Sequence, residues 1–491
     1  MKFTYIALIL LLGSCIGQAQ EDVKLTKINV DKEDATSHIW FLASDELRGR
    51  ETGSPEIDIA AAYIASQLRK YGVKPIEGSY YQQVELESTS PPVEGSFTFG
   101  DETFTQGKDL ITVEAVNLST EADIVFVGYG LPDKLTKKVK GKIVVALVGS
   151  APDDNFRTYY GLSNKKRSAA LENGAVALVE IYSSNDLPWP RLMGYRNRSR
   201  LGIASENENE PSLGHIYIND ADGTLADQFE NSKKTKGKIM LSEKQVSSVD
   251  AKNVVGMIEG SDPLLKNEYI LISAHYDHVG VKQGTHGEDS IYNGARDNAI
   301  GVSAILAAAQ SMGKTASKRS ILFLACTGEE KGLLGSKWYA DHPPVPLKQI
   351  VYNLNIDGGG YNDITKVSVM GLNRTTAEKQ ITSSANAFGL DTFGDPAPEQ
   401  NLFDRSDNVA FAAKGIPAPT YSPGFTSFDE EIMKYYHQVT DEATSLDFEY
   451  ISKYILSYAL LVRRVANMDE TPFWIPGDKY EEAGKKLYGI E

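Results

Sequence analysis

From Val254 onward, short apolar runs alternate with helix-like stretches, and this alternation limits the possible folds more than any other feature of the sequence. Expected strands and helices follow one another at Tyr269 to Ala274, Ala299 to Met312, Ser320 to Ala325, Leu333 to Asp341, Ile350 to Ile356 and Val367 to Met370. Such alternation is typical of a mainly parallel sheet covered by helices on both faces. We therefore predict an α/β fold built on a mainly parallel, mixed sheet.

The chain before this block predicts further α/β structure. The apolar rhythm between Asp34 and Tyr71 predicts two helices, and β-branched runs with one helix between Ala122 and Val179 predict a small α/β unit. We expect the main domain to be built from residues 25–115 and 251–475. An inserted domain is expected over residues 116–250, and a C-terminal tail over residues 476–491.

Composition excludes several classes of protein. The chain has 491 residues, of which 41% are hydrophobic and 24% are charged, as in ordinary globular proteins. Its formal net charge of −16 opposes a polyanionic partner through long-range repulsion. We therefore expect no nucleic-acid partner.

The first residues predict export. An apolar run from Ile6 to Leu12 follows Lys2 and is shorter than a membrane span, so residues 1–19 are interpreted as a signal peptide. Gly17-Gln18-Ala19 resembles an ordinary cleavage site, whereas Leu12-Gly13-Ser14-Cys15 resembles a bacterial lipoprotein box. Lipidated Cys15 would attach the protein to a membrane. The predicted location is the periplasm or cell surface, either as an outer-membrane lipoprotein or as a secreted protein.

Polar side chains follow the expected strands at the points where each strand ends. His275 and Asp277 follow the first strand, Glu329 and Glu330 follow the second, and Asp357 follows the third. Ligands of open α/β sheets bind at the carboxyl ends of the strands. This edge of the sheet is therefore the expected functional site.

Charge and ligand chemistry indicate metal ions at this site. A cluster of Asp297, Glu330 and Asp357 raises the pKa of each carboxyl unless cations neutralise it. Mixed imidazole and carboxylate ligands suit Zn²⁺, and a carboxylate shared by two ions is the geometry of two-metal hydrolysis. We therefore expect two zinc ions per chain, with Asp297 as the bridge.

Two further carboxylates have expected roles beside the ions. Asp277 and His275 can share a side of the extended backbone, so that Asp277 orients the imidazole of His275. Of the adjacent Glu329 and Glu330, one is expected to bind metal and the other to take a proton from the metal-bound water. Glu329 is the predicted general base.

The ordered motifs resemble a known superfamily. The order is His275-x-Asp277, Gly294-Ala295-x-Asp297-Asn298, Gly328-Glu329-Glu330, Asn355-x-Asp357 and a late His437. This set resembles the di-zinc aminopeptidase superfamily, which includes bacterial leucyl aminopeptidases, glutamate carboxypeptidase II and glutaminyl cyclases. The resemblance implies a zinc-exopeptidase fold. Gly141 to Val145 and Glu172 to Ala175 resemble the protease-associated domain that some members insert before the first metal ligand.

The resemblance also implies the roles of individual residues. It assigns one zinc ion to Asp297, Glu330 and His437, and the other to Asp297, His275 and Asp357. Members hold the peptide bond after the bridging aspartate in the cis form, so the Asp297–Asn298 bond is expected to be cis.

A downstream loop adds candidates for substrate contact. Arg405-Ser406-Asp407-Asn408 resembles the family's Arg-Ser-Asp-His loop, with Asn408 where His is common. Arg405 and Tyr436 are candidates to stabilise the oxyanion.

The implied function is that of an exported zinc aminopeptidase. It removes N-terminal residues from peptide substrates by means of a water that bridges the two metals, with Glu329 as base. One alternative is a zinc carboxypeptidase or amidohydrolase acting on N-acyl or acidic substrates. Another is a receptor-like binding protein that has the fold without the metals.

Overall fold

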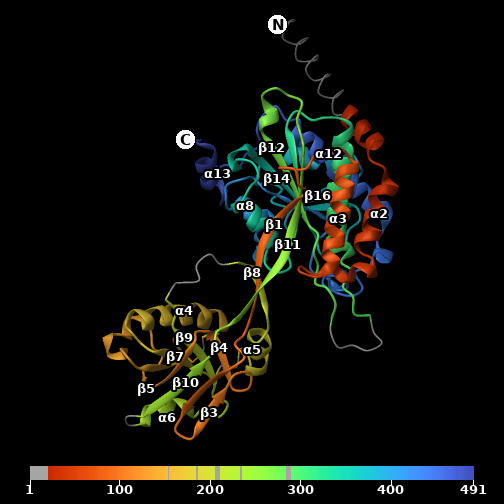
Figure 1. Ribbon diagram of the computed structural model, residues 1–491. Helices are drawn as coiled ribbons and strands as arrows, with labels where there is room; N and C mark the ends of the chain where they lie inside the picture. The colour runs from red at the N-terminus through yellow and green to blue at the C-terminus, as the bar shows by residue number, and fades with distance from the viewer. Residues whose placement is uncertain are drawn as a thin grey trace. The chain divides into compact units, whose positions relative to one another are not determined.

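The computed structural model describes residues 20–152, 154–183, 186–204, 211–232, 235–282 and 289–490 (Figure 1). The chain divides into two compact units, one formed by Met1–Glu85 with Asp250–Glu491 and the other by Leu86–Val249. The predicted signal peptide and Cys15 lie outside the described residues. Among the helices that are described, none is both long and apolar enough to cross a membrane.

The first unit is built on a mixed sheet, as predicted. Its strands, in spatial order, are β16 (Asp391–Phe393), β15 (Lys366–Met370), β17 (Thr420–Pro423), β14 (Ile350–Ile356), β12 (Tyr269–His275), β13 (Ser320–Cys326), β11 (Gln245–Ile258) and β1 (Tyr81–Ser90). Strand β12 pairs in parallel with both β13 and β14, and β14 pairs in parallel with β17. Strands β11 and β15 run antiparallel to their neighbours β13 and β17.

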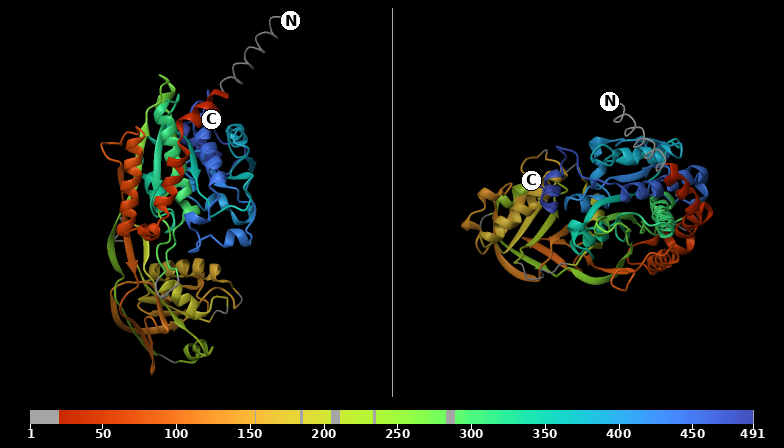
Figure 2. Two further views of the ribbon diagram at one scale, coloured as in Figure 1. Left: turned by 90° about the vertical axis from the view of Figure 1, so that its right-hand side faces the viewer. Right: turned by 90° about the horizontal axis from the view of Figure 1, so that it is seen from above.

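Helices cover both faces of the central strands. The helices of this unit are α2 (Lys32–Leu42), α3 (Pro55–Lys70), α7 (Ile300–Lys314), α8 (Leu334–Asp341), α9 (Glu378–Asn386), α10 (Asn408–Ala412), α11 (Glu430–Met433), α12 (Phe448–Ala466) and α13 (Glu481–Tyr488). Figure 2 shows α2 and α3 in red and α12 in blue from two further directions. Helix α13 occupies the segment expected as a C-terminal tail, and its Tyr488 hydroxyl donates to the carbonyl oxygen of Ile350 at 2.7 Å.

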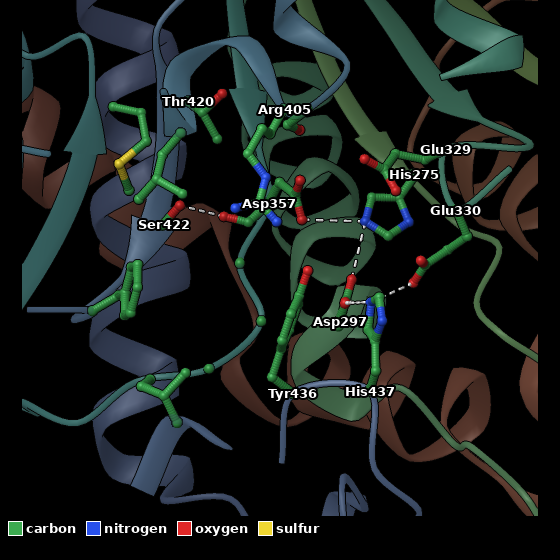
Figure 3. Close-up of a pocket in the computed structure, with 18 of the residues that line it drawn as sticks. His275, Asp297, Glu329, Glu330, Asp357, Arg405, Thr420, Ser422, Tyr436 and His437 are labelled. Carbon is green, nitrogen blue, oxygen red and sulfur yellow. Dashed lines mark hydrogen bonds and ion pairs between the residues drawn. The ribbon is translucent and has the colours of Figure 1, made fainter. Parts of the chain in front are cut away.

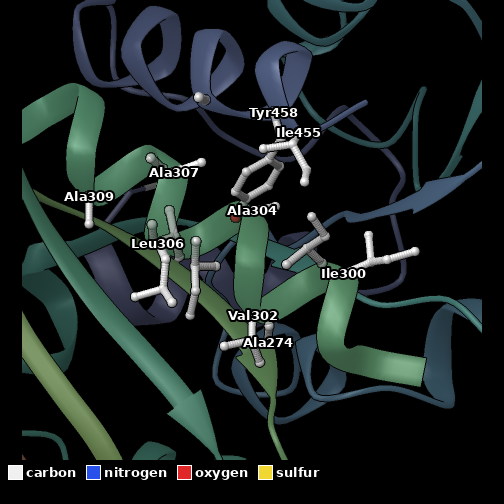
Figure 4. Close-up of a cluster of buried hydrophobic side chains, with 14 of the residues drawn as sticks. Ala274, Ile300, Val302, Ala304, Leu306, Ala307, Ala309, Ile455 and Tyr458 are labelled. Carbon is white, nitrogen blue, oxygen red and sulfur yellow. The ribbon is translucent and has the colours of Figure 1, made fainter. Parts of the chain in front are cut away.

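The strands are apolar on both sides because each side packs on helices. In β12, Ile270 and Ile272 join a core with α2, α3, α7 and α12, whereas Leu271 joins a second core with Tyr339 and Trp474. Figure 4 shows the first core, where side chains of α7 meet Ile455 and Tyr458 of α12. Because both faces of these strands are buried, polar side chains are found where each strand ends, at the carboxyl edge of the sheet.

The second unit contains its own mixed sheet. Its strands, in order, are β3 (Glu102–Thr105), β2 (Gly95–Phe99), β10 (Lys236–Leu241), β5 (Leu118–Phe126), β6 (Ile143–Leu147), β7 (Ala177–Tyr182), β9 (Gly214–Asn219) and β4 (Leu110–Glu114). Its helices are α4 (Phe156–Glu172), α5 (Trp189–Arg196) and α6 (Leu225–Asn231). Short strand β8 (Arg200–Ile203) pairs with Leu86–Thr89 of β1.

This unit starts earlier than the expected insertion over residues 116–250. Strand β2 pairs with β10, and β3 pairs with β2, so the segment before residue 116 belongs to the second sheet. The α/β character predicted for residues 122–179 is present in β5, β6, α4 and β7. Its assignment as a protease-associated domain stays a prediction.

Candidate metal centre

The carboxyl ends of three parallel strands supply most of the site. Strand β12 ends at His275, β13 is followed by Glu329 and Glu330, and β14 is followed by Asp357. Because these strands run in parallel, their ends meet at one edge of the sheet. Figure 3 shows the side chains converging there.

One group of donors surrounds the imidazole of His275. Its Nε2 lies 3.1 Å from Oδ1 of Asp297 and 3.1 Å from Oδ1 of Asp357 (Figure 3). One ligand atom from each of the three residues lies within 4.8 Å of the others, so a single cation can contact all three. These are the three ligands that the resemblance implies for one zinc ion.

A second group forms around the other oxygen of Asp297. Nε2 of His437 lies 3.2 Å from Oδ2 of Asp297 and 3.2 Å from Oε1 of Glu330. Asp297 therefore directs its two carboxylate oxygens at different imidazoles. This is the arrangement of a bridging ligand between two metal positions.

His278 also belongs to this second group, although the sequence motifs do not indicate it as a ligand. Its Nδ1 lies 2.8 Å from Oε1 of Glu330, and a ligand set of His278, Asp297 and Glu330 is also compact enough for one cation. The signal in the sequence was its position three residues after His275, at the same strand end. Unlike His437, His278 does not line the pocket of the site.

The turn before α7 holds Asp297 in place. Arg296 forms an ion pair with Asp441 at 3.1 Å, and the carboxylate of Asp441 also accepts the backbone N–H groups of Arg296 and Asp297. The Asp297–Asn298 peptide bond is cis, as predicted. The Asn298 side chain donates to the carbonyl oxygen of Ile356 at 2.9 Å and so ties this turn to the end of β14.

Asp277 contacts the site differently from the expected arrangement. Nδ1 of His275 lies 3.2 Å from the backbone carbonyl oxygen of Asp277 but 3.8 Å from its carboxylate. The carboxylate instead accepts the backbone N–H groups of Glu329 and Glu330, at 3.1 and 3.3 Å, and the hydroxyl of Thr52 at 3.0 Å. Asp277 therefore orients the two glutamates as well as the histidine.

Glu329 has the environment of a proton acceptor. It lines the pocket together with the metal-ligand candidates. Burial, and next the negative charges of Asp357, Asp407 and Glu330, raise the pKa of Glu329 well above its usual value, against the lowering effect of His275. A carboxyl group with a raised pKa is suited to take and return a proton near neutral pH.

The pocket beside the donors has a volume of about 140 Å³, and several of its lining residues are apolar. These are Met370, Leu402, Phe425, Phe428 and Ile432. Phe425 lines the pocket, whereas the aromatic residues Phe403, Phe411 and Tyr421 are buried in the core.

Arg405 and Tyr436 also line the pocket. The ring of Tyr436 stacks on that of His437, with centroids 4.2 Å apart, and lies against Gly359, where a Cβ would come within 2.2 Å of the ring. Asn408 points elsewhere, since its amide donates to the carbonyl oxygens of Phe403 and Ala418 at 2.9 and 3.1 Å. Asn408, which stands where histidine is common in the family, therefore stabilises the loop through these two hydrogen bonds.

The donor set fits divalent metal ions. Nε2 of His278 is buried, and among the described residues it has no hydrogen-bond partner. Oε1 of Glu330 lies beside the imidazoles of His278 and His437. Burial raises the pKa of Asp297, but the imidazoles of His275 and His437 outweigh it and bring that pKa well below its usual value. Converging carboxylates and imidazoles with unused lone pairs are the ligands that Zn²⁺ binds.

A strand edge that gathers imidazoles and carboxylates around a shared aspartate defines a metal-dependent hydrolase. Residues 253–459 match the model of peptidase family M28. Aminopeptidase YwaD of Bacillus subtilis (strain 168) is 24% identical over 374 residues, which cover 73% of this chain and 78% of that protein.

Two further comparisons concern the fold and a part of the chain. The solved structure of an aminopeptidase from Aneurinibacillus sp. strain AM-1 has the same fold, with a TM-score of 0.57 and 22% identity, over 93% of this chain and 98% of that one. A vacuolar membrane protease of Lachancea thermotolerans is 30% identical over 164 residues, which cover 33% of this chain and 15% of that protein.

Proposed function

We propose that this protein is an exported zinc-dependent aminopeptidase that removes N-terminal residues from peptides, with Glu329 as general base. The observation that carries the proposal is the division of the Asp297 carboxylate between two groups of donors, each of which can hold a cation. The names of the bacterial relatives agree with this activity.

The residues on the two sides of Asp297 would hold two zinc ions. His275 and Asp357 would complete one site, and Glu330 and His437 the other. His437 is preferred to His278 because it lines the pocket and its Nε2 lies 3.2 Å from both Asp297 and Glu330. When bound, the ions polarise the substrate carbonyl and lower the pKa of a water molecule.

Glu329 would move the proton. It takes the proton from the attacking water and later returns it to the amine nitrogen that leaves. Its place in the pocket beside the metal-ligand candidates supports both steps. Tyr436 and Arg405 line the same pocket and are proposed to bind the oxygen that becomes negative during attack.

The apolar residues that line the pocket predict a preference for apolar N-terminal residues. A free α-amine in its neutral form can bind beside the metal centre, and a blocked N-terminus removes this contact.

The leader is part of the proposal. Residues 1–19 are proposed to direct export. Lipid on Cys15 is proposed to attach the exported protein to a membrane, at the cell surface or in the periplasm. The native N-terminus can be identified by mass determination. Replacement of Cys15 by Ser is expected to move the protein from the membrane fraction to the soluble fraction.

Activity is tested with aminoacyl p-nitroanilides and their N-acetylated analogues, after dialysis against a chelator and reconstitution with Zn²⁺. We expect turnover only with a free α-amine and only with metal. Cleavage restricted to N-acylated or acidic substrates would assign the alternative hydrolase activity. Failure to bind zinc would instead favour the alternative of a binding protein that has the fold without the metals.

A further inference from the structure

The second unit contains a basic cavity that the proposed catalysis does not use. It has a volume of about 200 Å³ and is lined by residues of α5 and the segment after it, together with parts of β1 and β4 that lie in the same unit. Its basic lining residues are Arg196, Arg198, Arg200 and Lys244. Four cations around one cavity are unusual in a chain whose formal net charge is −16.

Within the described part of this unit, these positive charges have no ion-pair partner. Among the described residues, none of the four forms an ion pair, and the one acidic residue that lines the cavity, Glu114, is already paired with Arg167. Like charges held together repel one another, so such a cluster stabilises the fold only when an anion binds between them. The balance of charge therefore favours an anionic ligand.

Arg196 gives the most direct evidence for a ligand. Its Nε and Nη2 atoms are buried, and within the described part of the chain neither has a hydrogen-bond partner. The guanidinium carbon lies 5.1 Å from the centroid of the Tyr160 ring, a contact that fixes the group without using its N–H donors. Buried donors without acceptors cost free energy, and a bound oxyanion removes that cost.

The other two arginines are exposed and both contact the ring of Tyr195. Their guanidinium carbons lie 5.3 Å (Arg198) and 4.7 Å (Arg200) from the centroid of this ring. Nη2 of Arg200 additionally donates to the backbone carbonyl oxygen of Tyr195 at 3.3 Å. Planar guanidinium groups bind the two oxygens of a carboxylate in parallel.

We propose that this basic cavity binds the carboxylates of an acidic peptide segment. The choice of a peptide rests on the proposed function, since peptides are the substrates of an aminopeptidase, while the choice of a carboxylate rests on the arginine geometry. The site would hold an acidic stretch of a polypeptide through residues that are not part of the metal centre. It would bind this stretch whether or not the chain is cleaved.

Binding is measured with the full mature protein and a fluorescein-labelled peptide of alternating Glu and Gly, blocked at its N-terminus so that it cannot be hydrolysed. Fluorescence anisotropy at low and at physiological salt gives the dissociation constant. The matched peptide contains Gln in place of Glu. Anionic phospholipid vesicles and inorganic phosphate are the competing ligands.

The test variant is the triple change Arg196→Gln, Arg198→Gln and Arg200→Gln. Its matched control, Lys137→Gln with Lys138→Gln and Lys140→Gln, removes the same charge from exposed residues of the same unit that do not line the cavity. Arg196→Gln alone keeps the test valid if the triple variant folds poorly. Hydrolysis of leucine p-nitroanilide by each variant is measured in parallel.

We expect the Glu peptide to bind at least tenfold more tightly than the Gln peptide. The arginine triple variant should lose at least tenfold in affinity, the lysine control less than twofold, and hydrolysis should be unchanged in both. Equal losses in the two triple variants, or preferential binding of vesicles or phosphate, would overturn the proposal. Absent hydrolysis with intact peptide binding would contradict the proposed function alone.

Discussion

Asp297 illustrates how one side chain organises the site. Its Oδ1 faces His275 and its Oδ2 faces His437, two residues that stand far apart in the sequence. The sequence indicated a bridging role because Asp297 belongs to an acidic cluster that requires cations, and two-metal hydrolysis uses a shared carboxylate. The sharing of its two oxygens depends on how the backbone turn and Asp441 hold it, which no local pattern describes.

Glu329→Gln tests the assignment of the general base. We expect zinc content to stay unchanged and kcat to fall by roughly 10²–10⁴-fold, the usual contribution of a positioned proton acceptor. Metal analysis of the purified variant and single-turnover kinetics give the two quantities. The control is Glu330→Gln, which should lose metal as well as activity. Substantial turnover by Glu329→Gln would assign the base elsewhere.

His437 and His278 compete for the second metal position. We expect His437→Gln to retain one zinc ion per chain and to bind the second at least tenfold more weakly, because it loses the imidazole that faces the pocket. His278→Gln should retain two ions with weaker affinity, since the ring of His278 contacts Glu330 but does not line the pocket. Titration with Zn²⁺ under a competing chelator measures both. The reverse order would make His278 the ligand.

His38 predicts a pH dependence of stability away from the metal centre. Its ring nitrogens lie 2.8 Å from the hydroxyl of Tyr63 and 2.9 Å from that of Tyr71, and burial lowers its pKa to about 4 although Asp34 opposes the shift. Between pH 6.5 and 4 the unfolded chain binds the proton and the folded chain does not.

The stability that neutral His38 contributes is therefore complete above pH 6.5 and is lost as the pH falls toward 4. The loss is on the order of 3 kcal/mol at most. Urea unfolding across this range should show a smaller pH dependence in His38→Gln, which keeps one hydrogen bond but cannot titrate. Parallel curves for the two proteins would exclude His38 as the cause.

The predicted strands and helices agree with the structure where the apolar pattern alone determines them. The strands predicted at residues 269–274, 320–325 and 350–356 appear as β12, β13 and β14, and the helix predicted over residues 299–312 appears as α7. Strands buried on both faces are continuous apolar runs, so they are easy to identify. The antiparallel pairing of β15 with β17 was not predictable, because pairing depends on partners distant in sequence.

A buried polar cluster joins helix α4 to the sheet of the second unit. Nζ of Lys166 lies 2.8 Å from Oε1 of Glu180, and Nε2 of His215 lies 2.8 Å from Oε2; all three side chains are fully buried. Glu180→Gln leaves the ammonium of Lys166 without a counter-charge. We expect the free energy of unfolding of this unit to fall by about 3–5 kcal/mol.

Calorimetry or urea unfolding measures this loss. The control Glu121→Gln breaks the exposed pair between Lys236 and Glu121 in the same unit and should cost less than about 1 kcal/mol. Adding Lys166→Met to Glu180→Gln should recover part of the stability, because the unpaired charge is removed. A loss in Glu180→Gln no larger than in the control would show that the buried pair contributes little.

Metal binding links distant parts of the first unit. The donors extend from His275 at the end of β12 to His437, beyond β17, and a ligand that binds only the folded state stabilises it by mass action. At a free zinc concentration about a thousandfold above Kd, the gain is about 4 kcal/mol.

Removal of metal with a chelator should therefore lower the melting temperature of the first unit and restore it on addition of Zn²⁺. The second unit contributes none of the donors, so its transition should not move. Differential scanning calorimetry with and without chelator resolves the two transitions. An equal shift of both would mean that the units unfold as one.

By itself, the sequence determined the α/β class, the main strands and the polar residues that follow them at the carboxyl edge of the sheet. Strands that are buried on both faces are continuous apolar runs, and such runs can be recognised locally. Only the tertiary structure decided that His278 contacts Glu330, that the carboxylate of Asp277 accepts the N–H groups of both glutamates, and that the second sheet begins before residue 116. These features depend on side-chain directions and strand partners. They arise from packing between distant segments, which short-range patterns do not encode.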